Sequence, residues 1–166
     1  YLSKAKHTVD NVASGSTAKG TESASKDATA SHSVTPAIPT VEAQKNIVRD
    51  RITAGQSATG TISGTNGAVP VSELHLADLD FFTADVTFGG FTAAPQWPTG
   101  ATTAEVTYHL LDGTTETKSF AQGAVPPAPS GPISGFELTY RGNTIQPSTT
   151  GGASFTIDTT TDAAAG

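Results

Sequence analysis

The sequence contains no cysteine and no methionine, and only 14% of its 166 residues are charged. Without cysteine there is no disulfide bond and no thiolate metal site. The formal net charge is −6 and the pI is near 5.0, so no basic stripe is available for a nucleic acid or an anionic membrane surface. We therefore expect no nucleic-acid partner and no membrane insertion in this segment. Because the first residue is Tyr1, we also expect the chain to be a piece of a longer protein.

Helical spacing of apolar residues is also nearly absent. Residues 73–82 alone are dense enough in apolar side chains to suggest a helix, and we interpret their first half as a strand and their end as a turn. Elsewhere glycine and proline separate short alternating runs that are typical of strands. These runs cover residues 5–13, 24–35, 41–48, 57–63, 85–88, 102–111, 114–121, 133–141 and 153–159. The chain is therefore predicted to be all-β.

A hairpin is the clearest local prediction. Residues 105–110 alternate and residues 114–120 return, with Asp112-Gly113 between them, a dipeptide that tolerates the positive φ angles of a tight primed turn. The apolar members of the alternating runs should point inward and form the core of a sandwich. They are Ile62, Leu74, Leu76, Val106, Tyr108, Leu110, Phe136, Leu138, Phe155 and Ile157.

Two proline-rich joints divide the chain. One lies at residues 125–132 and separates the hairpin from the final strands; the other, at residues 35–39, is expected to be a domain boundary. The segment before it, residues 1–33, has too few large apolar residues to build a core alone. We therefore expect this segment either to stay disordered or to complete something other than itself.

Several motifs, in their order, resemble a conserved tandem repeat of large bacterial, and in particular actinobacterial, surface proteins. The opening motifs are PTVEAQKN (39–46), ITAGQS (52–57), ISGTN (62–66) and LHLADL (74–79). Two further motifs resemble later strands of the repeat: WPTGATTAEVTYHLLDGTT (97–115) and ISGFELTYRGNTIQP (133–147). The end of such a repeat is resembled by VDNVASG (9–15) together with SHSVTPAIP (31–39). The boundaries of the repeat do not coincide with the ends of the chain, so the chain would hold the end of one repeat and most of the next.

This resemblance implies an immunoglobulin-like β-sandwich, extracellular or cell-wall placement, tandem repetition and no known catalysis. It implies that residues 1–36 are closing strands of a preceding repeat and that residues 38–162 form the sandwich. Surface repeats of this general architecture sometimes carry a lysine–asparagine isopeptide bond. By the same resemblance, Lys45 on a first strand and Asn143 on a late strand are the candidate pair, although Lys45 also reads as a surface lysine.

The polar residues form no catalytic or metal-binding pattern in the sequence. His7, His32, His75 and His109 are dispersed without ligand spacing, and we interpret them as polar residues of solvated strand faces. Asp78 and Asp80 could share one face of a strand, but they lack the further oxygens that calcium needs, and Asp78 is expected to cap a turn. We therefore predict no catalytic residue, no metal and no cofactor.

Trp97 is the candidate contact for a ligand, because an aromatic ring can form a platform for a sugar. Three functions stay open: a structural repeat of a surface stalk, fibre or fimbria-like assembly; an adhesive or carbohydrate-binding module that uses Trp97 and a surface glycan; and an accessory domain of a secreted enzyme. The first is favoured. Its expected partners are other copies or adjacent repeats, joined head-to-tail by residues 1–33 adding strands to an open sheet edge.

Overall fold

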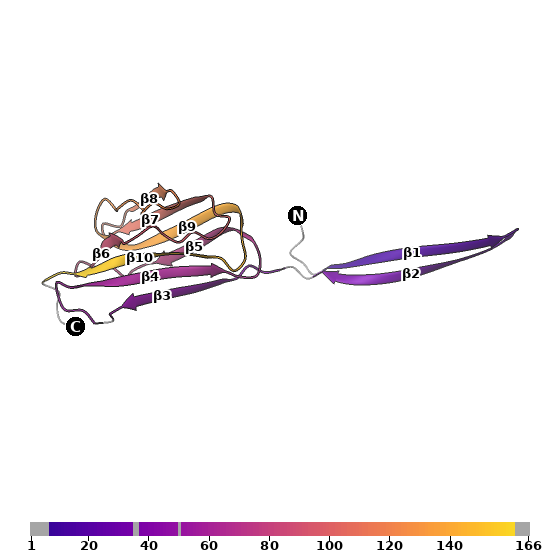
Figure 1. Cartoon of the computed structure of the whole chain (residues 1–166), viewed down its shortest axis with the longest axis horizontal. Coiled ribbons are helices and arrows are strands. Elements are labelled where there is room, and N and C mark those ends of the chain that lie inside the picture. The colour runs from indigo at the N-terminus through magenta and orange to yellow at the C-terminus, as the bar shows by residue number, and fades with distance from the viewer. Residues whose placement is uncertain (1–6, 35–36, 50, 162–166) are drawn as a thin grey trace. The chain divides into compact units, whose positions relative to one another are not determined.

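The computed structural model describes residues 7–34, 37–49 and 51–161. It divides into two compact units, Tyr1–Ile38 and Pro39–Gly166, which are described separately. All described elements are strands, drawn as arrows in Figure 1. The described residues contain no helix that is long and apolar enough to cross a membrane.

The N-terminal unit is a two-stranded antiparallel hairpin. Strands β1 (His7–Lys19) and β2 (Glu22–Val34) pair over thirteen residues each, from His7 opposite Val34 to Lys19 opposite Glu22. Gly20 and Thr21 make the two-residue turn, in which Gly20 takes a positive φ of 63°, as the first central residue of a type II′ turn does. Every side chain of the hairpin that is described is exposed, so these side chains form no core.

The second unit is a sandwich of two four-stranded antiparallel sheets. One sheet has the order β3-β4-β10-β6 and the other β5-β9-β7-β8. The strands are β3 (Val41–Val48), β4 (Ser57–Asn66), β5 (Val71–Asp78), β6 (Val86–Phe91), β7 (Thr103–Leu110), β8 (Thr115–Phe120), β9 (Ile133–Ile145) and β10 (Thr150–Thr159). Neighbouring strands are often far apart in sequence, as β10 between β4 and β6 is, so the sheets depend on long-range pairing.

A cluster of aromatic rings fills the space between the two sheets. Phe136 and Phe155 are fully buried and meet edge to face, with ring centroids 5.2 Å apart. Phe82, Phe88 and Phe91 surround them from the segment around β6. Glycine on β4 makes room for this cluster, because a Cβ atom at Gly60 would lie 2.5 Å from the Phe155 ring.

The expected strands and core agree closely with this architecture. The all-β class and the sandwich are confirmed, and nine of the ten predicted core residues are buried; Leu110 is half-buried and packs against the core. The hairpin of residues 105–120 is also confirmed, but its predicted primed turn is wrong. The loop has three residues, 111–113, and only Gly113 has a positive φ, which fits a type I turn followed by a left-handed residue.

Truncation of the central ring should show how much the sandwich depends on this cluster. Phe136→Ala removes a ring that contacts four others, and large-to-small changes at such sites cost about 4 kcal/mol. We expect urea denaturation to show this loss, while Val125→Ala, at a half-exposed loop position, changes the free energy of unfolding by less than about 0.5 kcal/mol. Equal effects of the two changes would contradict this account of the core.

Candidate functional sites

Trp97 lines an open groove of about 520 Å³ on the sandwich unit. The loop that carries it is anchored on β10, because Gln96 and Gly152 exchange backbone hydrogen bonds of 2.8 and 3.1 Å. The indole packs edge to face on Phe120 and Tyr140, with centroids 6.0 and 5.9 Å away. Its Nε1–H is buried and donates to no acceptor among the described residues. The structure therefore places the predicted contact residue at the wall of a hollow, with its indole N–H buried away from solvent.

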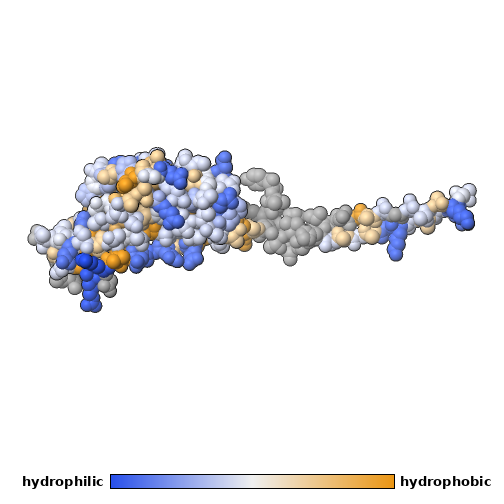
Figure 2. Space-filling view, in the orientation of Figure 1, coloured by the Kyte–Doolittle hydropathy of each residue, from blue (hydrophilic) through white to orange (hydrophobic). Residues whose placement is uncertain are grey.

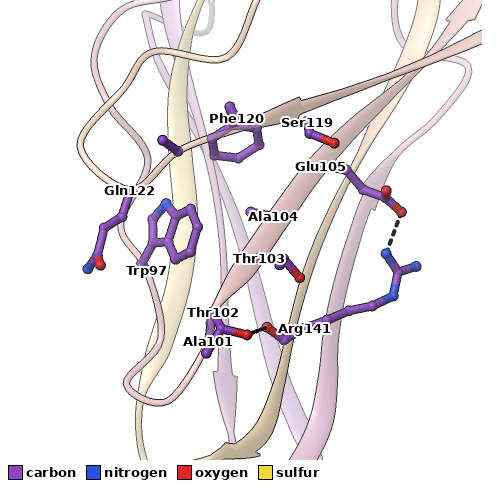
Figure 3. Close-up of a pocket in the computed structure, with 11 residues that line it drawn as sticks. Trp97, Ala101, Thr102, Thr103, Ala104, Glu105, Ser119, Phe120, Gln122 and Arg141 are labelled. Carbon is purple, nitrogen blue, oxygen red and sulfur yellow. Dashed lines mark hydrogen bonds and ion pairs between the residues drawn. The ribbon is translucent and has the colours of Figure 1, made fainter.

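Polar side chains surround the rest of this groove (Figure 3). Glu105 and Arg141 are joined by an ion pair, and the Arg141 guanidinium also donates to Glu73 at 2.9 Å. Gln122 lines the opposite part of the groove, beside Trp97, whereas Ser119 on β8 lies next to its register partner Glu105. An aromatic ring, a paired acid and base, and amide and hydroxyl groups are the set with which proteins hold polyhydroxylated ligands.

Lys45 spans the two sheets. Its Nζ donates to Asp78 Oδ1 at 2.7 Å and lies 3.8 Å from the centroid of the Phe81 ring. Asp78 is 6% exposed and its Oδ2 is buried without a hydrogen-bond partner, whereas the Lys45 side chain is 35% exposed. Lys45 is thus a cross-sheet clamp that balances a buried carboxylate, and the predicted turn-capping role of Asp78 is wrong.

Asp80 and Asn143, which the sequence suggested as partners of Asp78 and Lys45, lie apart from this clamp. Asp80 follows the end of β5 with a positive φ of 57° and is exposed, so it does not share a strand face with Asp78. Asn143 is exposed on β9, seven residues beyond Phe136, the residue that pairs with Asp78. Seven residues of strand span roughly 20 Å. The structure therefore does not bring the Lys45 amine to Asn143.

Two of the dispersed histidines converge on a single carboxylate. Glu137 on β9 accepts from His75 Nε2 at 2.6 Å and from His109 Nε2 at 2.5 Å, so the cluster crosses β5, β9 and β7. Partial burial acts to raise the pKa of Glu137, but the hydrogen bonds from His109 and His75 outweigh it and hold the pKa below its usual value. Sequence spacing missed this cluster because its members are 28 and 62 residues from Glu137. His7 and His32 lie in β1 and β2, and their side chains are outside the described set.

Within residues 7–34, 37–49 and 51–161, no group of three or more acidic or histidine side chains is arranged to hold a metal ion. The sites found are therefore a groove with an aromatic wall, a cross-sheet ionic clamp and a histidine–carboxylate cluster. No protein family, no curated protein and no solved structure matches the chain.

The clamp makes a testable contribution to stability. Lys45→Met leaves the buried Asp78 carboxylate without a partner, and we expect a loss of about 2 kcal/mol in the free energy of unfolding. Adding Asp78→Leu removes the orphaned charge as well and should restore most of the loss. Gln44→Met, at an exposed position of the same strand, is the matched control. A double variant that is less stable than Lys45→Met would contradict the clamp.

Proposed function

We propose that the chain is a structural repeat of a secreted bacterial surface protein, forming a stalk, fibre or fimbria-like assembly with a role in adhesion or cell–cell contact. In this proposal the sandwich is an immunoglobulin-like extracellular module. The hairpin β1–β2 joins each module to the next, either between separate subunits or along one tandem polypeptide.

The observation that carries the proposal is the hairpin. It extends for thirteen residue pairs, yet all of its described side chains are exposed. An isolated two-stranded hairpin is marginal at best in water, because its ladder is not backed by apolar burial. The stability of so long a ladder is therefore explained if another sheet covers it.

The direction of assembly follows from the difference between the two units. The hairpin offers edges and faces without a core, and the sandwich offers sheet edges above a filled core. A contact between unlike surfaces is heterologous, and such contacts propagate into chains when their rotation does not close. Main-chain pairing along a strand gives affinity with little dependence on large side chains, which suits the small residues of β1 and β2.

This function predicts self-association through the hairpin. In analytical ultracentrifugation the full chain should form species larger than a monomer as its concentration rises. A chain lacking residues 1–37 keeps the whole aromatic core and should stay monomeric with an unchanged urea midpoint. A full chain that stays monomeric into the millimolar range would rule out the assembly.

A second candidate function is favoured by the groove at Trp97. The aromatic wall, the Gln122 amide and the Glu105–Arg141 pair match the needs of a saccharide, whose hydroxyl groups require both donors and acceptors. Under this function the surface repeat would be a carbohydrate-binding or adhesive module.

A glycan array tests this second candidate. Selective binding is expected to fall at least about tenfold in Gln122→Ala, which removes a lining amide without touching the core, and to be lost in Trp97→Ala. Leu111→Ala, at an exposed position outside the groove, serves as the control. An array without any selective signal for the unmodified protein would remove this candidate.

A further inference from the structure

We infer that the surface that receives the hairpin of a second copy is the flank of the sandwich between the edge strands β3 and β5. This inference rests on the proposed function and names the docking site that it requires. The β3–β5 flank consists of the outer edge of β3 together with a groove of about 270 Å³ lined by Pro39, Thr40, Val41, Asn66, Val71, Glu73, Leu74 and His75.

The four sheet edges of the sandwich differ in how well they are protected. The β6 edge is irregular, because its register with β10 shifts at Thr156 and Gly90 takes a φ of 108°. The β8 edge turns the charged residues Glu116 and Lys118 toward a loop that bonds to both of them. Bulges and inward charges are the devices that blunt an edge against pairing. These two edges are therefore poor acceptors.

Strand β3, in contrast, is a regular and unprotected edge. It pairs with β4 through eight consecutive residues without a register shift, and Figure 1 shows it as the outermost strand of its sheet. Seven of its eight residues are exposed. An edge of this length presents a row of backbone groups that another strand can pair with.

The inward face of β3 is covered at one end only. Val41, Ala43, Lys45 and Ile47 share that face, since alternate residues of a strand point the same way, and Lys45 and Ile47 reach Asp78 and the core. At the other end Val41 is 57% exposed and Ala43 is exposed. The groove opens beside this uncovered end, where Val71 and Leu74 of β5 add apolar surface.

The hairpin has one face that fits such a surface. Its register places Ala13 opposite Ala28 and Thr17 opposite Ala24, with Ala30 on the same face. The opposite face is mainly polar, with Ser14, Ser16, Ser23, Ser25, Asp27 and Thr29, and it also carries Val12 and Ala18. Figure 2 shows the hairpin as mostly pale, with strongly hydrophilic colour at few positions. Small apolar side chains let one β-layer approach another closely, so the alanine face is the one to lie against Val41, Ala43 and the groove.

Charge favours the same pairing. Lys19 and Lys26 lie on the alanine face of the hairpin, beside Glu22. The groove is lined by Glu73, which Arg141 also contacts, and by no lysine or arginine, and Glu42 is exposed on the outward face of β3. Complementary charges of this kind set register and attract the correct partner.

A second copy is favoured over the chain's own hairpin by the connection between the units. Six residues, 35–40, link β2 to β3, and two of them are Pro36 and Pro39. The residue before a proline is driven toward extended conformations. Two prolines in so short a link restrict the backbone conformations available for the return that β2 would need to lie beside its own β3.

Four lysine variants of the full chain test the β3–β5 flank by analytical ultracentrifugation. Ala43→Lys on β3 and Ala28→Lys on the alanine face should each raise the dissociation constant of self-association at least about tenfold, the effect of 1.4 kcal/mol. Thr115→Lys, at the β8 edge, and Ser25→Lys, on the opposite face of the hairpin, are the matched controls and should associate as the unmodified chain does. All four positions are exposed, and urea unfolding checks that the sandwich is intact in each variant.

The outcomes separate this inference from the proposed function. If Ala28→Lys weakens association but Ala43→Lys does not, the hairpin still joins the copies and the assignment of the flank is overturned. Loss of association in Thr115→Lys, with Ala43→Lys unaffected, moves the acceptor to β8 and overturns it as well. An unmodified chain that is monomeric at every concentration overturns both, whether or not the hairpin folds back on its own sandwich.

Discussion

A two-stranded ladder leaves both of its outer edges and both of its faces in water, and the first unit of this chain is such a ladder. Backbone hydrogen bonds alone contribute little net stability, since water offers the unfolded strands equivalent partners. The sandwich, in contrast, buries a cluster of phenylalanine rings around Phe136 and Phe155. Apolar burial among the described residues is thus concentrated in the sandwich, and in the proposed assembly another copy supplies the hairpin with surface. The proposed assembly, the assignment of the acceptor flank and the role of the small residues all depend on this imbalance.

The flank by β3 is where the sandwich is least complete. One end of β3 is held across the sheets by Lys45, which balances the buried carboxylate of Asp78 beneath Phe81. The other end, at Val41 and Ala43, faces open space beside a groove. The clamp keeps the edge strand in place while the uncovered end stays available. In the proposed assembly, the stability of the module and its acceptance of a further strand would therefore be served by different halves of one strand.

The sequence predicted the strands and the core well, because alternation along a single strand is a local signal. Residues such as Leu138 and Ile157 are identified as inward by their neighbours alone. The pairing of Lys45 with Asp78, and of His75 and His109 with Glu137, depends on which strands become neighbours, and no spacing in the sequence encodes that order. The Gly20-Thr21 turn was missed for another reason: the small polar residues around it gave a weak strand pattern. The structure places Trp97 at a surface hollow whose polar residues come from three separate segments, a juxtaposition that no local pattern in the sequence encodes.

Amide hydrogen exchange of the hairpin tests the central claim, that another copy stabilises β1–β2, most directly. The amides to follow are those of Ala24, Ala28 and Ala30, and those of Phe136 and Leu138 in the sandwich serve as the internal standard. We predict that protection of the hairpin amides rises with protein concentration while that of the sandwich amides stays constant. Hairpin protection that is the same in dilute and concentrated protein would contradict the account, because the ladder would then be stable, or unstable, without a partner.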